Sequence, residues 1–478
     1  MKENQAEKTY RKRRREHWNR VAQKMDHWRG WGGYYHRRIV NIFQLLVPSG
    51  QRVLELGCGQ GDLLNALRPA TGVGIDFSEE MIRRARVRHP HLEFIEADVH
   101  RLTLSAPFDF IIISDLVNDL WDVQQVFQEL QKVVSPQTRI LINTYSRLWE
   151  LPLWAAKKTG LGKPVLFQNW LTVEDIAGML YLSGFEVVRH WEEILWPLPT
   201  PVVASFLNRF AAKLWPCKWF DLTHFMIARP FPRDDSGKEL PMVSVIVPAR
   251  NESGNIRDIF ARVPEMGRGT ELIFVEGHST DNTYERIEEA INEFPERRCR
   301  LFRQHGQGKG DAVRLGFEKA EGEMLMILDA DLTVPPEDLP RFYEVLMSGK
   351  GEFANGVRLV YPMEKEAMRF FNLIGNKFFS LAFTWLLGQP VKDTLCGTKV
   401  IWKRDYERIA QNRDYFGEFD PFGDFDLLFG AAKLNMKICD VPVRYRERLY
   451  GSTNIRRWHH GWLLIKMVIY ASRKLKFI

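Results

Sequence analysis

Two different kinds of ligand-binding pattern follow one another along this chain of 478 residues. Residues 53–61 form an apolar strand pattern that runs into a glycine-rich turn, and residues 324–331 form another apolar strand that ends in Asp329, Ala330 and Asp331. A glycine turn and a carboxylate pair suit different ligands, so their presence in one chain predicts two fused enzymes. The length agrees, because a single hydrophobic core rarely organises more than about 250–300 residues.

Strand and helix patterns alternate in both halves, which predicts an α/β fold with two domains. We expect a basic extension at 1–29, a first domain at 30–228, a proline-broken polar linker at 229–241 and a second domain at 242–478. The basic run Arg11–Arg15 is interpreted as a solvated tail. The seven strands expected in the first domain are residues 52–56, 72–75, 92–95, 108–114, 139–144, 185–190 and 221–228.

Composition indicates the compartment and the partners. The five cysteines include no CxxC pair, which argues against a disulfide framework or a zinc site and favours a reducing cytoplasm. We find no signal-peptide pattern and no run of about 20 apolar residues that could span a bilayer. Residues 370–387 and 461–470 could instead lie on a membrane, so we expect peripheral association with its inner face. Nucleic acid is not an expected partner, because basic and aromatic residues do not interleave as in a recognised motif.

The glycine turn predicts a nucleotide-type site at the end of the first strand. Gly57, Gly59 and Gly61 let the backbone approach a ligand where the next helix opens. Asp62 follows Gly61, so the spacing is GxGxG and not the GxGxxG of a dinucleotide site.

Three acids define this site further. Asp76 ends the second predicted strand, where it can accept both ribose hydroxyls, and Asp98 follows the third, where it can meet an adenine amino group. With Glu55 they describe a site for a nucleoside that lacks phosphates. On these residues the chain resembles the class I S-adenosylmethionine-dependent methyltransferases, with a Rossmann-like sheet of seven strands. The resemblance implies that Glu55, Gly57, Gly59, Asp76 and Asp98 contact S-adenosylmethionine, and Met81 either packs on the adenine or belongs to the core.

The methyl acceptor is left open by the sequence. Polar residues near strand ends supply six candidates for binding it or removing its proton, and each could equally be a cap or a surface group. They are Tyr34, Tyr35, His36, Asp115, Asn118 and Asp119. A non-catalytic scaffold is the alternative for this domain.

The second half carries a pattern for a diphosphate and a metal ion. Residues 248–252 follow a strand at 243–247, and Lys309 lies in a glycine turn where it could neutralise a diphosphate. Asp329 and Asp331 stand two residues apart after a buried strand, an arrangement that can hold Mg²⁺ or Mn²⁺ shared with substrate phosphates.

These motifs resemble the family two glycosyltransferases of GT-A fold, and the later ones resemble the dolichyl-phosphate mannose synthase branch. The resemblance implies a nucleotide-sugar donor, metal and diphosphate at Asp329, Ala330 and Asp331, and phosphate contacts from Arg358 and Arg448. It also implies that the nucleotide is lined by Pro248, Arg250, Glu252 and Val275. The chain departs from the family in having Glu276 and Gly277 where an acidic pair is usual, and Asn454 where a lysine is expected, a charge that Arg456 or Arg457 could replace.

The acceptor of the sugar has two alternatives. A polyprenyl phosphate is already ionised and needs little general base, whereas a saccharide hydroxyl needs a carboxylate, for which Asp393, Asp424 and Asp426 are candidates. We favour the lipid phosphate and take Asp331, Arg358, Arg448 and Asp393 as the catalytic set. Residues 441–448 are predicted to be a strand that carries Arg448 on one face.

Overall fold

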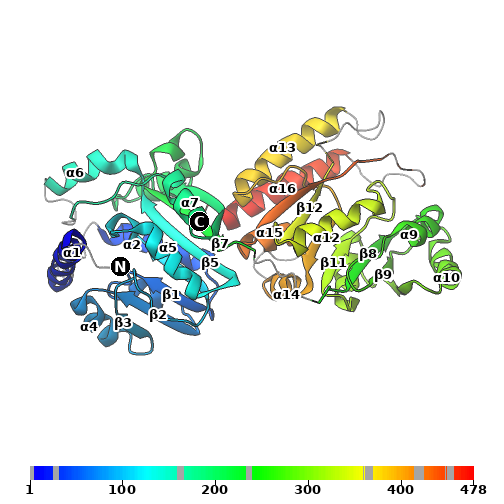
Figure 1. Cartoon of the computed structure of the whole chain (residues 1–478). Helices are drawn as coiled ribbons and strands as arrows, with labels where there is room; N and C mark the ends of the chain where they lie inside the picture. The colour runs from blue at the N-terminus through cyan, green and yellow to red at the C-terminus, as the bar shows by residue number, and fades with distance from the viewer. Residues whose placement is uncertain are drawn as a thin grey trace. The chain divides into compact units, whose positions relative to one another are not determined.

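The computed structural model describes residues 5–24, 32–158, 166–232, 239–358, 360, 370–413, 425–446, 448, 450 and 457–477. Internal contacts divide the chain into two compact units, Met1–Phe231 and Pro232–Lys476 (Figure 1). Each unit is built on its own sheet of seven strands. The α/β fold class and the seven-stranded first sheet expected from the sequence are therefore confirmed.

The first sheet has the order β3-β2-β1-β4-β5-β7-β6. The five strands from β3 to β5 are parallel, and β7 pairs antiparallel with both β5 and β6. All carboxyl ends of β1 to β5 consequently meet at one edge. The bounds are β1 (Arg52–Leu56), β2 (Thr71–Asp76), β3 (Glu93–Glu96), β4 (Phe108–Ser114), β5 (Val134–Tyr145), β6 (Phe185–Glu193) and β7 (Thr223–Pro230).

Helices cover both faces of this sheet because its strands are apolar on both sides. Val53 of β1 packs with α2, α3 and α4, while its neighbour Leu54 packs with α5 and α7 on the other face. The helices are α1 (Gln5–Lys24), α2 (Gly32–Leu46), α3 (Asp62–Ala66), α4 (Glu79–Arg88), α5 (Val123–Glu129), α6 (Glu150–Lys158), α7 (Val173–Leu182) and α8 (Val203–Arg209).

The second sheet has the order β10-β9-β8-β11-β13-β12-β14. It is parallel from β10 to β11, while β13 runs antiparallel to both of its neighbours. The bounds are β8 (Val243–Ala249), β9 (Thr270–Glu276), β10 (Arg298–Arg303), β11 (Met324–Ile327), β12 (Phe353–Val357), β13 (Lys399–Trp402) and β14 (Ile438–Pro442).

The helices of the second unit also form two layers. One face of the sheet packs on α9, α10 and α12, and the other packs on α11 and α13 to α16. None of the helices described in this structure is both long and apolar enough to cross a membrane. The bounds are α9 (Ile256–Arg262), α10 (Thr283–Glu293), α11 (Lys309–Lys319), α12 (Leu339–Met347), α13 (Phe370–Leu387), α14 (Lys403–Gln411), α15 (Phe425–Lys433) and α16 (Arg457–Leu475).

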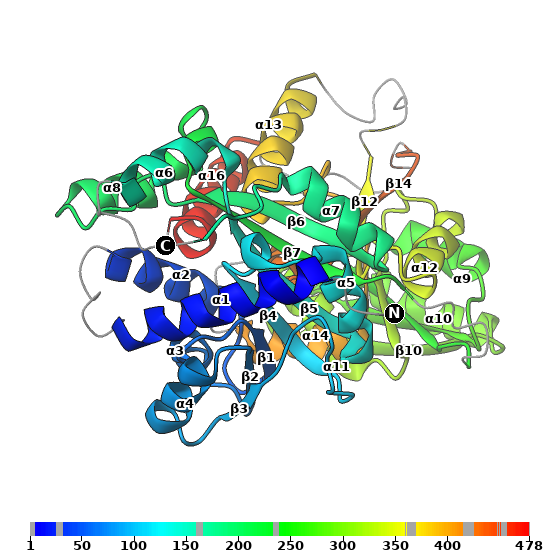
Figure 2. The same cartoon turned by 60° about the vertical axis from the view of Figure 1, so that its left-hand side comes forward.

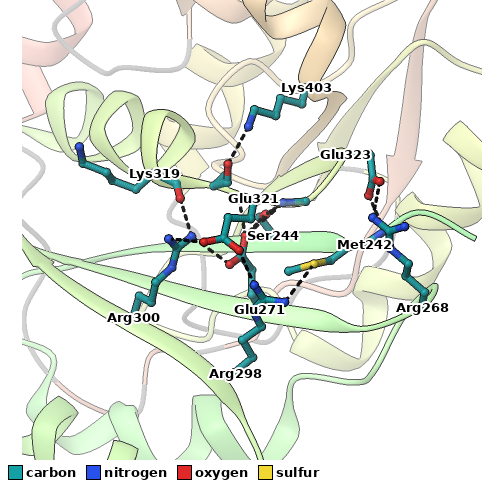
Figure 3. A network of polar contacts seen from close by, with 12 residues as sticks. Met242, Ser244, Arg268, Glu271, Arg298, Arg300, Lys319, Glu321, Glu323 and Lys403 are labelled. Carbon is teal, nitrogen blue, oxygen red and sulfur yellow. Dashed lines mark hydrogen bonds and ion pairs between the residues drawn. The ribbon is translucent and has the colours of Figure 1, made fainter.

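A buried polar network fixes the amino ends of the central strands of this sheet (Figure 3). The carboxylate of Glu271, which is fully buried, accepts hydrogen bonds from Ser244, from the backbone N–H groups of Glu321 and Gly322, and from Arg300 at 3.0 Å. A buried carboxylate is stable only with such a set of donors. The network holds β8, β9 and the turn before β11 together at the end opposite the predicted site.

Three expectations need correction. The basic run Arg11–Arg15 is not a solvated tail, because it lies within α1 and Arg14 is 5% exposed. Strand β7 continues through Pro230, into the stretch predicted to be linker. The strand predicted at residues 441–448 ends at Pro442. Val443 N still donates to Val357 O of β12 at 2.9 Å, but Arg446 N donates to Thr333 O at 2.9 Å instead.

Candidate active sites

The glycine turn of the first unit connects β1 to α3 at the carboxyl edge of the sheet. Gly57 has φ +71° and Gly59 has φ +53°, a left-handed conformation that other residues rarely adopt. A Cβ on Gly57 would also lie 2.8 Å from Leu116 Cδ1. Glu55, in β1, is 3% exposed, and its Oε2 accepts the N–H of Leu64 at 3.1 Å. Burial raises the pKa of Glu55 well above its usual value.

The carboxylate of Asp76, at the end of β2, holds this turn in place. Its Oδ2 accepts the N–H of Gly59 at 3.0 Å, and its Oδ1 accepts the N–H of Ser78 at 2.9 Å. The acid predicted to bind the ribose therefore lies directly beside the turn predicted to approach the cofactor.

Asp98, predicted to meet the adenine, has two cationic or potentially cationic partners. Its Oδ1 lies 2.7 Å from His100 Nδ1, and its Oδ2 lies 2.8 Å from an Arg11 Nη. Burial opposes ionisation of Asp98, but His100 and Arg11 outweigh it, so its pKa lies below the usual value. The carboxylate is therefore ionised and can accept a hydrogen bond.

Helix α1 packs over this end of the site, next to α4 (Figure 2). Asn19 Oδ1 accepts the hydroxyl of Ser78 at 2.5 Å, and Trp18 packs with Val21 and Met81 in a small apolar cluster. Met81 is 3% exposed and contacts α1, so its side chain belongs to the core in this structure. One sequence signal for this role of α1 is the helical spacing of Trp18, Val21 and Ala22 on a basic helix.

Two of the acceptor candidates come together at the carboxyl ends of β4 and β5. The hydroxyl of Tyr35 donates to Asp115 Oδ1 at 2.9 Å, and Asn143 Nδ2 donates to the same oxygen at 2.6 Å. Tyr145 lies alongside, with its ring centroid 5.9 Å from that of Tyr35. Burial, with Asp115 nearby, raises the pKa of both phenols well above the usual value, so both stay neutral donors. Asn143 and Tyr145 were not predicted, since nothing local distinguishes them from core residues.

The other acceptor candidates have different surroundings. Asn118 is fully buried and bonded to Asn169 O and Thr144 Oγ1, which is a structural arrangement. Asp119 Oδ2 accepts the indole N–H of Trp18 at 3.1 Å, which links it to α1. Tyr34 accepts a hydrogen bond from Asn208 of α8 at 3.0 Å, and His36 is exposed.

In the second unit, Glu252 lies in the turn after β8. Asn255 Nδ2 donates to it at 2.8 Å, Thr283 Oγ1 accepts its backbone N–H at 3.0 Å, and Arg448 lies 3.4 Å from its carboxylate. Burial raises the pKa of Glu252 to about 7. Arg448 lowers this pKa, but burial and the negative charge of nearby Asp331 together outweigh its effect. Glu252 therefore changes charge near neutral pH.

The two aspartates after β11 each pair with a cation. Lys309 Nζ lies 2.6 Å from Asp329 Oδ1, and Arg448 Nη2 donates to Asp331 Oδ2 at 2.7 Å. Thr333 donates its hydroxyl to Asp331 Oδ1 at 2.8 Å. Burial opposes ionisation of Asp329, but Lys309 outweighs it and holds the pKa below its usual value. The structure thus gathers four predicted site residues from three separate segments.

The donor atoms here fit a hard divalent cation. Two carboxylates and the Thr333 hydroxyl are all oxygen ligands, which Mg²⁺ and Mn²⁺ prefer. Within the described ranges, no group of three or more His, Cys, Asp and Glu side chains is placed to hold a metal ion.

Arg358 and Asp393 form a buried ion pair. Arg358 donates from Nε at 2.7 Å and from Nη2 at 2.9 Å, and Asp393 is fully buried. Burial opposes ionisation of Asp393, but Arg358 outweighs it and lowers its pKa. This geometry argues against Asp393 as a general base and makes it the residue that positions Arg358. Of the other base candidates, Asp426 lies 3.4 Å from Arg413, and Asp424 is outside the described residues.

The remaining predicted residues differ in exposure. Pro248 is half-buried and Arg250 is exposed, whereas Val275 is fully buried, so only its backbone can border a ligand. Glu276, 5% exposed, accepts the N–H of Ser279 at 2.5 Å. Ala330 is buried between the two aspartates, and Asn454 and Arg456 are outside the described residues.

Comparison with known families assigns both units. Residues 244–427 match the model of glycosyl transferase family 2, and residues 48–177 match the model of a methyltransferase domain. The chain joins a methyltransferase domain to a family 2 glycosyltransferase domain. It is thus an enzyme with two transferase domains, as the sequence motifs predicted.

The glycosyltransferase domain has curated relatives. The chain is 28% identical over 246 residues to a dolichol-phosphate mannosyltransferase of Pyrococcus furiosus, a match that covers 49% of this chain and 67% of the relative. It is 30% identical over 236 residues to an undecaprenyl-phosphate 4-deoxy-4-formamido-L-arabinose transferase of Pseudomonas aeruginosa, covering 47% of this chain and 61% of the relative. The chain thus spans about two thirds or less of the length of these relatives.

Solved structures resemble each domain. A methyltransferase of Mesorhizobium loti is 22% identical with a TM-score of 0.31, covering 40% of this chain and 96% of that one. Glucosyl-3-phosphoglycerate synthase of Mycobacterium tuberculosis, solved with Mn²⁺ and UDP, is 18% identical with a TM-score of 0.37, covering 49% of this chain and 80% of that one.

Proposed function

We propose that the glycosyltransferase domain transfers a sugar from a nucleotide-sugar to a polyprenyl phosphate at the cytoplasmic surface of a membrane. The observation that carries this proposal is the cluster of Lys309, Asp329, Asp331 and Arg448 at the strand ends. The named relatives that act on dolichol phosphate and undecaprenyl phosphate support the choice of acceptor.

The reaction would break the bond between the anomeric carbon and the diphosphate and form a bond from that carbon to the acceptor oxygen. Asp329 and Asp331 would hold Mg²⁺ or Mn²⁺, which supplies positive charge for the diphosphate that leaves. Lys309 and Arg448 would move from the aspartates to phosphate oxygens, so their charge is retained when the donor binds. Pro248, Arg250 and the backbone of Val275 would border the nucleotide.

The surroundings of the candidate bases favour a phosphate over a hydroxyl as the acceptor. A hydroxyl acceptor must lose its proton to a base, but of the base candidates within the described residues, Asp393 is held by Arg358 and Asp426 lies next to Arg413. A phosphate acceptor is ionised already and needs no such group. Arg358 would then contribute charge toward the acceptor or leaving phosphate, oriented by Asp393.

For the methyltransferase domain we propose methyl transfer from S-adenosylmethionine bound by Glu55, Asp76, Asp98 and the turn from Gly57 to Gly61. Bound there, S-adenosylmethionine would supply its methyl group to an oxygen or nitrogen of the acceptor and would leave as S-adenosylhomocysteine. Asp115 would take the proton of the acceptor, oriented by Tyr35 and Asn143.

One assay tests the sugar transfer. Full-length protein is incubated with a panel of labelled nucleotide-sugars, polyprenyl phosphate and Mn²⁺, and the lipid is extracted. We expect label in the lipid, loss of at least about a hundredfold in Asp331→Asn, and no loss in the control Asp258→Asn, whose exposed side chain lies on α9. Label found only in water-soluble saccharide would show that the acceptor is a saccharide hydroxyl and not a lipid phosphate.

A further inference from the structure

Exposed aromatic and aliphatic side chains concentrate on two segments of the methyltransferase domain. One segment is α6, and the other runs from residue 202 through α8 to a short 3-10 helix at Cys217–Phe220. The exposed fractions are Leu151 75%, Trp154 55%, Phe206 60%, Trp215 72%, Trp219 57% and Phe220 60%. Scattered apolar residues are ordinary on a surface, but several aromatic residues on neighbouring segments mark a contact surface.

Positive charge predominates on both segments, in which Glu150 at the start of α6 is the one acidic residue. Residues 151–173 and 194–220 contain no Asp or Glu, while they include Lys158 and Lys218. Lys158 Nζ lies 4.0 Å from the ring centroid of Trp154, and Lys218 is 40% exposed. Lys218 also lies 4.0 Å from Glu192, at the edge of this region. Aromatic rings interspersed with basic residues that outnumber the acids are typical of surfaces that enter the headgroup layer of anionic membranes.

The two segments form one preformed surface, which we call the aromatic surface. The indole N–H of Trp149, just before α6, donates to Phe220 O at 2.8 Å. Asn208 of α8 is 1% exposed, and its Oδ1 accepts the N–H of Trp196 at 2.7 Å. In Figure 2, α6 and α8 lie next to each other. No ordering of these residues is therefore needed before they meet a partner.

The aromatic surface also adjoins the acceptor end of the methyltransferase site. Asn208 donates to the hydroxyl of Tyr34, whose neighbour Tyr35 donates to Asp115. Strand β5 ends at Tyr145, which packs on Tyr35, and α6 begins five residues later. A molecule held at this surface is thus presented to the side of the domain where the methyl group would be transferred.

We propose that the aromatic surface docks the methyltransferase domain on an anionic lipid bilayer, and that its methyl acceptor is carried on a lipid. The docking is independent of the sugar transfer proposed above, whereas the nature of the acceptor rests on the proposed methyl transfer.

The test uses Cys217, which lies within the aromatic surface. In full-length protein carrying Cys299→Ser and Cys439→Ser, Cys217 is labelled with an environment-sensitive dye, since Cys58 and Cys396 are buried. The protein is then mixed with vesicles of phosphatidylcholine, with or without phosphatidylglycerol. We expect a blue shift and increased emission with the anionic vesicles, and no change for a dye at Cys299 in the Cys217→Ser and Cys439→Ser protein.

Variants identify the docking residues by co-sedimentation with the same vesicles. The measurement is made in a Phe378→Ser and Leu381→Ser background, which removes two exposed apolar side chains of α13 in the other domain. Trp154→Ser, Phe206→Ser and Trp219→Ser together should weaken binding about tenfold or more. The control Tyr181→Ser with Leu182→Ser, equally exposed on α7, should leave binding unchanged.

Two results would overturn the proposal. The first is a Cys217 dye that does not respond to anionic vesicles. The second is a triple variant that binds vesicles as well as its parent. Light scattering that shows self-association abolished by the triple variant, without a vesicle response, would assign the surface to a second copy of the chain. The dye emission and the co-sedimentation do not depend on sugar transfer to lipid. Failure of the glycosyltransferase proposal can therefore be distinguished from failure of this one.

Discussion

Two ion pairs lie where the diphosphate is proposed to bind in the glycosyltransferase domain. Lys309 pairs with Asp329 and Arg448 pairs with Asp331, and each pair joins residues far apart in the sequence. Such pairs are stable in a half-buried site because each charge compensates the other. Binding of a metal and a diphosphate would exchange partners without leaving any of the four charges unpaired.

Gly397 is the residue that makes room for the pair of Lys309 and Asp329. A Cβ at this position would overlap with Asp329 Oδ2 and with Lys309 Nζ. We expect Gly397→Ala to displace both charges and to weaken metal-dependent binding of a nucleotide-sugar at least about tenfold, as calorimetry would measure. Gly375→Ala is the matched control, because a Cβ there meets no atom within 4 Å. Equal affinities of the two variants would show that the pair does not contribute to binding.

Glu252 predicts a pH dependence of donor binding. Its pKa of about 7 lies above the usual value, so the carboxyl is largely protonated at pH 6 and ionised at pH 8. Raising the pH adds a negative charge next to Arg448 and the proposed diphosphate, which opposes binding of the donor. We expect affinity for a nucleotide-sugar to fall on the order of fivefold from pH 6 to pH 8. Glu252→Gln should bind equally at both values, and a dependence that persists in this variant would exclude Glu252 as its origin.

At the scale of elements, α1 was predicted to be a charged extension, but in the structure it packs against the methyltransferase site. Asn19 of α1 accepts hydrogen bonds from Ser78 Oγ, and the backbone of Ser78 donates to Asp76. Loss of one such bond costs about 1 kcal/mol, so Asn19→Ala should weaken binding of S-adenosylhomocysteine about fivefold. Lys12→Ala, on the exposed side of α1, is the control. Titration calorimetry of both variants decides whether α1 supports the cofactor site.

The elements also show what the sequence could predict. The first seven strands were predictable because their apolar runs and the turn at Gly57 are local signals. The contact of Arg11 with Asp98 joins distant segments, and from charge alone Arg11–Arg15 looks like a solvated tail. The prediction of a strand at 441–448 was wrong for a similar reason, because contacts with a distant segment decide the structure there. Its alternating pattern continues past Pro442, but the backbone there bonds to Thr333 and so brings Arg448 to Asp331.

At the scale of the whole molecule, each domain has its own sheet, core and predicted ligand, which predicts two independent unfolding transitions. A ligand stabilises only the unit that binds it, by about 2.7 kcal/mol at a hundred times its dissociation constant. In scanning calorimetry of the full chain, S-adenosylhomocysteine should therefore raise the temperature of one transition, and a nucleotide-sugar with Mn²⁺ should raise the other. Asp76→Ala should abolish the first shift and keep the second, while Asp331→Asn should do the reverse. One cooperative transition that both ligands raise would show instead that the two domains unfold as a single unit.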